Sequence, residues 1–106
     1  MDLPELSHLQ MLVIEALGAR RVSGRELREA MGKLGLKKTA PAFYQLMSRL
    51  EEGHFVEGEY EQKLIDRVAI KERFYRLTGT GARAYRDTLR FYSERSTEGM
   101  VAGFSK

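Results

Sequence analysis

The chain has 106 residues, 42% of them hydrophobic, which is enough for one small domain with a modest core. Eighteen Lys and Arg face fifteen Asp and Glu, and the net charge of +3 is compatible with nucleic-acid binding without requiring it. The absence of cysteine excludes disulfides, thiolate metal sites and a thiol nucleophile. No apolar run reaches the roughly 20 residues that cross a bilayer, and the first residues lack a signal-peptide pattern. We therefore expect a soluble cytoplasmic protein that makes no membrane contact.

The first predicted helix follows Ser7. Ser7 and Gln10 have capping-box spacing, and apolar residues then recur at helical period until Gly18. Met11 and Ile14 lie off the main stripe, so this helix is apolar around most of its circumference. We expect it to pack against more than one neighbour, which makes these two residues candidates for an interface with a second copy.

Two more helices are predicted next. Ser23 and Glu26 repeat the capping-box spacing ahead of a short apolar stripe that ends at Gly35. Thr39 can cap a third helix that has Pro41 in its first turn, where a missing N–H does no harm. The polar face of this third helix combines aromatic, amide, hydroxyl and guanidinium groups, unlike the Lys and Glu of an ordinary solvated face. These residues are Tyr44, Gln45, Ser48 and Arg49.

The second half of the chain predicts a hairpin and a last helix. Residues 55–61 and 69–77 are β-prone runs, and we expect a long, mobile tip around residues 63–67. Thr78 then caps a helix with two apolar stripes, which implies two packing partners. One stripe contains Tyr85, Leu89 and Tyr92, and the other contains Ala84, Thr88 and Phe91. Residues 96–106 show no sustained period and are expected to form a flexible tail.

This order of elements is that of a winged helix-turn-helix, an α+β fold that is mostly helical. Three helices, the second and third joined by a short turn, precede a two-stranded hairpin. In such a module the third helix enters the major groove, because a helix is about the only element that fits there. The hairpin, or wing, would lie along the phosphates or in an adjacent groove.

Several motifs resemble those of the PadR-like winged-helix transcriptional regulators, over roughly residues 9–92. Residues 23–27, Ser-Gly-Arg-Glu-Leu, match the opening of that family's second helix, and Tyr44 with Arg49-Leu50-Glu51 matches its recognition helix. Residues 75–81, Tyr-Arg-Leu-Thr-Gly-Thr-Gly, match its strand-end signature. The resemblance implies a homodimer of the small form, which lacks a large C-terminal domain. It implies a DNA-binding domain over residues 1–95, with a C-terminal dimerisation helix over about 79–95.

Two positions depart from the family pattern. The family usually has proline after the tyrosine of the third helix, where this chain has Gln45. A glycine usual at the end of that helix falls here on His54, one place after Gly53. The first change alters the candidate DNA contacts. The second requires either Gly53 or His54 to adopt the left-handed conformation, at some cost for histidine.

Candidate DNA contacts lie at the start of the third helix, on its polar face and on the wing. At the helix start, backbone N–H groups also attract phosphate, although a solvated loop with a cap explains these residues too. On the polar face Gln pairs with adenine and Arg with guanine, although Tyr44 could be half core and Arg49 could pair with Glu51 or Glu52. The full predicted set is Ser23, Arg25, Lys37, Lys38, Thr39, Tyr44, Gln45, Ser48, Arg49, Lys63 and Arg67.

Within the wing, Lys63 and Arg67 are favoured for DNA because they fall at the expected tip. The basic residues of the second strand have acidic residues of the first strand as an alternative partner, in exposed pairs that contribute little stability. The basic residues are Lys71, Arg73 and Arg76, and the acidic ones are Glu57, Glu59 and Glu61.

The remaining residues indicate neither catalysis nor a bound cofactor. Ion pairing explains most carboxylates, no phosphate-binding glycine loop is present, and two distant histidines without cysteine do not make a metal site. The predicted dimer interface contains Met11, Ile14, Tyr85, Leu89, Phe91 and Tyr92. A more specific hypothesis than a simple dimer core is that this interface also binds a small aromatic effector.

The sequence therefore predicts a sequence-specific DNA-binding transcriptional regulator, most readily a dimeric repressor that reads a pseudo-palindromic operator in double-stranded DNA. The alternative is a winged-helix module that binds a protein and not DNA. The modest net charge and five glutamates between Glu51 and Glu61 keep this alternative open, because acid beside the recognition helix repels phosphate.

Overall fold

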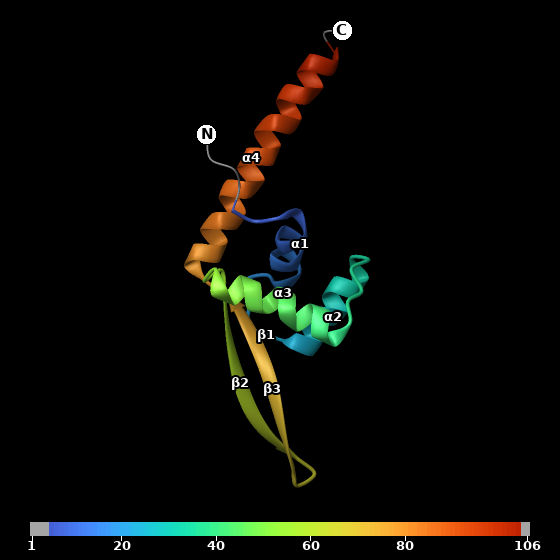
Figure 1. Ribbon diagram of the computed structural model, residues 1–106, viewed down its shortest axis with the longest axis vertical. Helices are drawn as coiled ribbons and strands as arrows, with labels where there is room; N and C mark the ends of the chain where they lie inside the picture. The colour runs from blue at the N-terminus through green and yellow to red at the C-terminus, as the bar shows by residue number, and fades with distance from the viewer. Residues whose placement is uncertain (1–4, 105–106) are drawn as a thin grey trace.

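The computed structural model describes residues 5–104, with side chains described for residues 5–95. Helices α1–α3 lie in the middle, the wing extends from them in one direction, and α4 extends in the other (Figure 1). The molecule is accordingly elongated, at 68 × 26 × 21 Å. In chain order the elements are α1 His8–Leu17, β1 Val22–Ser23, α2 Gly24–Lys33, α3 Ala40–Glu52, β2 Val56–Ile65, β3 Val68–Leu77 and α4 Gly79–Phe104. This is the predicted α+β winged helix-turn-helix.

Each of the first three helices begins where a side-chain oxygen accepts a backbone N–H. The Ser7 hydroxyl accepts from the Gln10 N–H at 3.1 Å, and the Gln10 side chain accepts from the Ser7 N–H at 2.9 Å, which completes the predicted capping box. The Ser23 hydroxyl caps α2 at 3.1 Å and the Thr39 hydroxyl caps α3 at 3.3 Å. Each cap is worth about 1 kcal/mol of helix stability, so these boundaries follow from local chemistry.

The core lies where α1, α2 and α3 meet β3. Tyr75 of β3 is 1% exposed, and its ring packs edge-on against Phe43 of α3 with centroids 6.2 Å apart. Ile14 of α1, predicted at a dimer interface, is 3% exposed inside this cluster. Its side chain therefore packs within its own chain, which leaves it little surface for a second copy.

Strand β1 was not foreseen from the sequence. Val22 and Ser23 pair with Tyr75 and Phe74 of β3, which gives an antiparallel sheet of order β1-β3-β2. Two residues are too few to show a strand periodicity, so only the tertiary pairing reveals this element.

The wing ends in a tight turn, so the prediction of a long, mobile tip is wrong. Strands β2 and β3 have ten residues each and stay in register until Ile65 faces Val68. Asp66 and Arg67 form the turn with φ values of 50° and 66°. Positive φ at both central residues suits the right-handed twist of a hairpin, and the β-prone residues on either side extend the ladder to the turn. Lys63 consequently lies on a strand and not at the tip.

His54 takes the left-handed conformation at the end of α3. Its φ is 63°, whereas Gly53 has a φ of −79°. The His54 N–H donates to the Glu51 carbonyl at 2.9 Å, and the Thr78 hydroxyl lies 2.6 Å from the His54 carbonyl oxygen. These contacts place the turn at His54 despite the conformational cost for a residue with a Cβ atom.

Thr78 and Gly81 together direct the chain from β3 into α4. The Gly81 N–H donates to the Thr78 hydroxyl at 2.9 Å, as in a helix cap. A Cβ atom at position 81 would overlap the carbonyl oxygen of Phe55, so this position requires glycine for close packing. The strand-end motif therefore packs the start of α4 against the chain just after α3.

Helix α4 continues to Phe104, beyond the predicted end near residue 95. Residues 96–104, which we expected to form a flexible tail, are helical, and residues 105–106 lie outside the described part of the chain. The reason is that an isolated glycine costs a helix only about 1 kcal/mol, and the residues around both glycines here tolerate a helix. Ala84 and Thr88 are buried, whereas Leu89 and Tyr92 are 51% and 48% exposed. One stripe of α4 thus packs on its own chain, whereas the other packs there through Tyr85 and leaves Leu89 and Tyr92 exposed.

Replacing Gly81 with Ala should destabilise the fold by about 1 to 3 kcal/mol, because the new methyl group would overlap backbone that cannot move aside cheaply. Gly79→Ala is the matched control in the same helical turn, since a Cβ there meets nothing within 4 Å. Urea denaturation of both variants measures the difference. Equal stability of the two variants would contradict the packing role of Gly81.

Tyr75 should make stability depend on alkaline pH. Burial, partly opposed by the positive charge of Arg73, raises the pKa of Tyr75 from 10.0 to about 12. Because the folded-state pKa lies above the unfolded one, this contribution is complete below pH 10 and is lost as the pH rises towards 12. By linkage the loss is of the order of 2 to 3 kcal/mol. Denaturant titrations between pH 9 and 12 should show this loss in the wild type relative to Tyr75→Phe. Parallel profiles for the two proteins would refute it.

Candidate nucleic-acid interface

Basic side chains gather beside the amino end of α3. A hollow of ≈ 420 Å³ lies between α2 and the segment that leads to α3. Arg28 donates to the Lys38 carbonyl oxygen at 3.2 Å and holds this segment against α2. The hollow is lined by Arg25, Arg28, Glu29, Gly32, Lys37 and Lys38. Within residues 5–95 no ion pair joins Arg25, Lys37 or Lys38 to an acid. Their charges therefore face solvent beside a positive helix end, which is an arrangement that attracts anions.

The outward face of α3 presents groups that pair with base edges. Gln45, Ser48 and Arg49 are all exposed. Gln45 and Arg49 line a smaller hollow of ≈ 190 Å³ together with Lys38. Arg49 makes no ion pair with Glu51 or Glu52, which removes the alternative raised from the sequence. Within residues 5–95 its guanidinium has no ion-pair partner, which leaves it available for a bidentate contact.

Three predicted contact residues have structural roles. Ser23 is 2% exposed and its hydroxyl caps α2, so its side chain lacks the exposure that contact with DNA requires. Tyr44 is 43% exposed, and its ring packs edge-on against Phe43 at 5.1 Å between centroids. Tyr44 is therefore partly buried against the core, which is the alternative raised from the sequence. Thr39 is exposed but uses its hydroxyl as the cap of α3.

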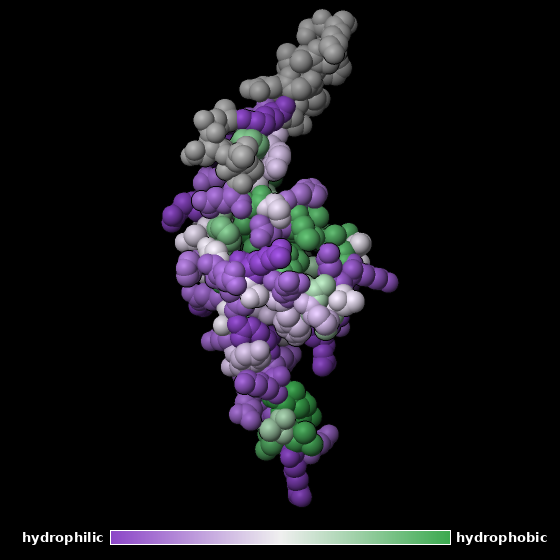
Figure 2. Space-filling view, in the orientation of Figure 1, coloured by the Kyte–Doolittle hydropathy of each residue, from purple (hydrophilic) through white to green (hydrophobic). Residues whose placement is uncertain are grey.

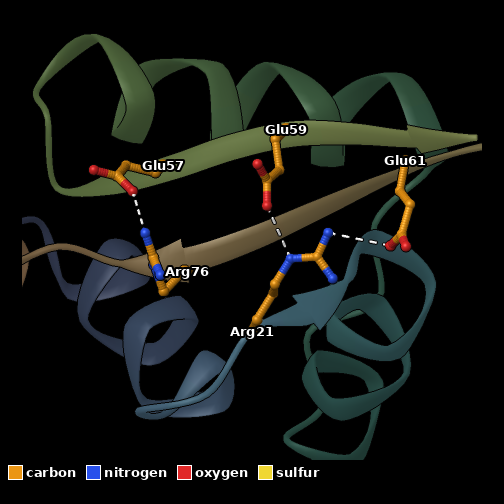
Figure 3. Close-up of polar contacts among 5 residues, drawn as sticks. All are labelled: Arg21, Glu57, Glu59, Glu61 and Arg76. Atoms are coloured by element: carbon orange, nitrogen blue, oxygen red, sulfur yellow. Dashed lines mark hydrogen bonds and ion pairs between the residues drawn. The ribbon is translucent and has the colours of Figure 1, made fainter.

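The three glutamates of β2 are paired with arginines. Arg21, in the loop before β1, reaches Glu59 at 3.0 Å and Glu61 at 3.2 Å (Figure 3). Arg76 pairs with Glu57 at 2.8 Å across the hairpin, and this hydrogen-bonded pair raises the pKa of Arg76. Such exposed pairs add little stability, but they cancel negative charge that would otherwise repel phosphate.

Arg73 joins the wing to the end of the recognition helix. Its guanidinium pairs with Glu51 of α3, and it lies 4.5 Å from the ring centroid of Tyr60 and 5.6 Å from that of Tyr75. A Cβ atom at Gly58 would overlap the ends of the Glu51 and Arg73 side chains, so glycine leaves room for this pair in its present position. From the sequence, the wing glutamates were the alternative partners of Arg73, whereas in the structure its partner is Glu51 of α3. The overlooked signal was a glycine inside a strand, which often marks a close approach.

The two predicted wing contacts differ. Lys63 lies 3.5 Å from the carboxylate of Glu72 and 5.2 Å from the ring centroid of Phe74, so its charge is partly used within the hairpin. Arg67 is exposed at the turn and forms no ion pair with any side chain within residues 5–95. The geometry favours Arg67 over Lys63 as a phosphate contact.

An apolar groove of ≈ 500 Å³ separates α1 from α4. It is lined by His8, Met11, Leu12, Glu15, Tyr85, Leu89 and Tyr92. Four of the six predicted interface residues are among them. Of the other two, Ile14 is buried in the core, and Phe91 lies under the guanidinium of Arg95, 3.5 Å from its ring centroid.

The described residues, 5–104, bear on two other kinds of site, a membrane span and a metal centre. None of the helices there is long and apolar enough to cross a membrane. No group of three or more His, Asp or Glu side chains is placed to hold a metal ion in that part of the chain.

No protein-family model matches the sequence, and no curated protein matches it either. Solved structures do match. A PadR-family transcriptional regulator from Eggerthella lenta has a TM-score of 0.68 over 87% of this chain and 79% of its own, at 24% identity. A PadR-like transcription factor from Bacteroides fragilis has a TM-score of 0.70 over 88% of each chain, at 17% identity. PadR from Bacillus subtilis, solved with operator DNA, has a TM-score of 0.62 over 78% of this chain and 48% of its own, at 19% identity. The chain therefore has the winged-helix fold of these PadR-family transcriptional regulators.

Proposed function

We propose that this protein is a transcriptional regulator that binds double-stranded DNA through α3 and the wing. The observation that carries the proposal is the group of unpaired cations Arg25, Lys37 and Lys38 at the amino end of α3. They adjoin a helix face that exposes Gln45 and Arg49. Cations position the protein on phosphates, and amide and guanidinium groups discriminate bases.

The electrostatics of the wing support DNA over a protein partner. The argument for a protein-binding module rested on five glutamates near the recognition helix. Four of them are paired, with Arg73, Arg76 and Arg21. Phosphate approaching α3 consequently meets little uncompensated acid. The operator-bound state of Bacillus subtilis PadR supports the same function by its similar fold.

The dimeric arrangement is also a proposal. A second copy would cover the groove between α1 and α4, where Leu89 and Tyr92 leave about half of their surface exposed. A two-fold dimer presents two copies of α3 to half-sites about 34 Å apart, one turn of the duplex. Repression then follows when the operator overlaps a promoter. The same groove is the place for a small aromatic effector, because Tyr85 and Tyr92 line it.

The experiment that tests this function starts from a pool of randomised duplexes. Duplexes retained by the protein are sequenced, and the enriched duplex and a scrambled version are labelled and titrated by fluorescence anisotropy at low and physiological salt. A DNA-reading regulator binds the enriched duplex more tightly and loses affinity steeply with salt. No binding to either duplex at low salt would reject the proposal in favour of a protein-binding module.

Replacing Gln45 or Arg49 with Ala should reduce the preference for the enriched duplex by about 1 to 3 kcal/mol for each lost bidentate base contact. The same titrations measure it, with enriched and scrambled duplexes compared for each variant. Leu34→Ala serves as a control, since it removes an exposed side chain at the end of α2. If both α3 variants discriminate as well as the control, α3 does not read bases.

Replacing Lys38 with Ala should weaken binding to all duplexes by a similar factor. It should also reduce the slope of log affinity against log salt concentration by about one unit, because one phosphate contact is lost. Lys63→Ala should change the slope less, since Lys63 already lies beside Glu72. Affinity measured at several salt concentrations gives both slopes. An unchanged slope in Lys38→Ala would remove that residue from the phosphate contacts.

A further inference from the structure

The end of the wing carries aliphatic side chains that the fold leaves uncovered. We call Leu64, Ile65, Val68 and Ile70 the aliphatic wing tip, and they are 74%, 50%, 60% and 40% exposed. Figure 2 shows them as a separate apolar cluster at the far end of the wing, beyond a polar stretch. An exposed cluster of this kind commonly marks a contact with another molecule.

The register places aliphatic groups on both faces of the hairpin. Cross-strand partners project to the same face, and Ile65 faces Val68 while Lys63 faces Ile70. Ile65, Val68 and Ile70 therefore share one face, whereas Leu64, paired with Ala69, lies on the other. Every residue from 61 to 70 is exposed, so the described part of the chain does not cover either face here.

The charges around the tip favour a polyanion as the partner. Residues 61–72 contain three cations, Lys63, Arg67 and Lys71, and three acids, Glu61, Asp66 and Glu72. Glu61 pairs with Arg21 and Glu72 lies beside Lys63, which leaves Arg67 and Lys71 against Asp66. Lys71 also lies 4.5 Å from the ring centroid of Tyr60, so it is held along the wing. Aliphatic side chains beside exposed cations match a groove of DNA, which has apolar sugar walls between two rows of phosphates.

The length of the wing suits such a contact. Strand β2 has ten residues, which at about 3.3 Å per residue spans roughly 33 Å. One turn of B-form DNA is about 34 Å, so a wing anchored beside a major-groove helix is long enough to meet a neighbouring minor groove.

We propose that the aliphatic wing tip inserts into the minor groove of the duplex that α3 holds and partly unstacks a base step there. The proposal rests on the proposed function. Leucine and isoleucine side chains act as wedges in this way in minor-groove proteins, and pyrimidine–purine steps such as TA yield most easily. The tip would thus contribute affinity and a preference for deformable steps, while Arg67 binds the adjoining phosphates.

The test uses the enriched duplex with 2-aminopurine in place of the adenine of a TA step outside the α3 contacts, moved one step at a time. Unstacking of that base raises its fluorescence. Wild-type protein should raise the fluorescence at one position, and the double variant Ile65→Ser, Val68→Ser should not. The double variant should also bind roughly tenfold more weakly at every salt concentration, because a lost apolar contact leaves the salt slope unchanged.

Two matched variants separate the wedge from other roles of the wing. Ile65→Val with Val68→Ile keeps the tip aliphatic and should retain the fluorescence change. Arg67→Ala should retain the fluorescence change but reduce the salt slope by about one unit. Circular dichroism should show the wild-type fold in every variant, because the replaced side chains are exposed.

Three outcomes would overturn the proposal. Tight binding by the serine variant with a wild-type fluorescence change would reject the wedge and leave the proposed function intact. The same binding with a loss of self-association in sedimentation would assign the tip to a contact between copies. Failure of the wild-type protein to bind any duplex would reject the function and the wedge together.

Discussion

The packing of Tyr75 against the three-helix core is the contact on which the rest of the structure depends. Tyr75 belongs to β3, the central strand of the sheet, and it is 1% exposed against Phe43 of α3. Because β3 pairs with β2 over the whole wing, burial of this one ring sets the position of the wing relative to the recognition helix. Arg73 then reinforces the junction through Glu51, next to the space that Gly58 leaves free. Helix α3 and the wing are therefore packed directly against each other at their shared base.

Electrostatic pairing within the chain decides which charges are available to a ligand. The arginines Arg21, Arg73 and Arg76 form ion pairs with four glutamates around the wing. Within residues 5–95 the cations without an acidic partner include Lys37 and Lys38 at the start of α3, Arg49 on its outer face and Arg67 at the wing turn. A net charge of +3 understates this separation, because it sums paired and unpaired groups alike. The distribution of charge and not its total makes a duplex a suitable partner.

Apolar surface is left exposed at two places, and the two are of different kinds. The groove between α1 and α4 is lined by large side chains and continues the apolar character of two helices, which suits a second copy of the chain. The aliphatic wing tip is small, protrudes from the body and lies beside the exposed cations Arg67 and Lys71. Its shape and charge suit a narrow anionic groove better than a flat protein surface. The two surfaces lie on opposite sides of the helical core, so both contacts fit one assembly (Figure 1).

Local chemistry was readable from the sequence, because caps, helical period and strand propensity involve residues within a few positions of one another. Ser7, Ser23, Thr39 and Thr78 each mark a helix start in the sequence and in the structure. The same local patterns predicted a long, mobile wing tip, which is wrong. The β-prone residues on both sides of Asp66 continue the pairing of β2 with β3 up to a tight turn.

Only the tertiary structure decided the features that join distant positions. The pairing of β1 with β3, the partner of Arg73, the burial of Ile14 and the choice of His54 over Gly53 each depend on residues at least several positions away. Ser23 shows the boundary between the two levels. Its type and spacing predict a cap, but only the packing around it excludes its side chain from the DNA-facing surface. Sequence alone thus determined the four helices, the two wing strands and their order, whereas packing determined strand β1 and which charged and apolar side chains remain exposed to a partner.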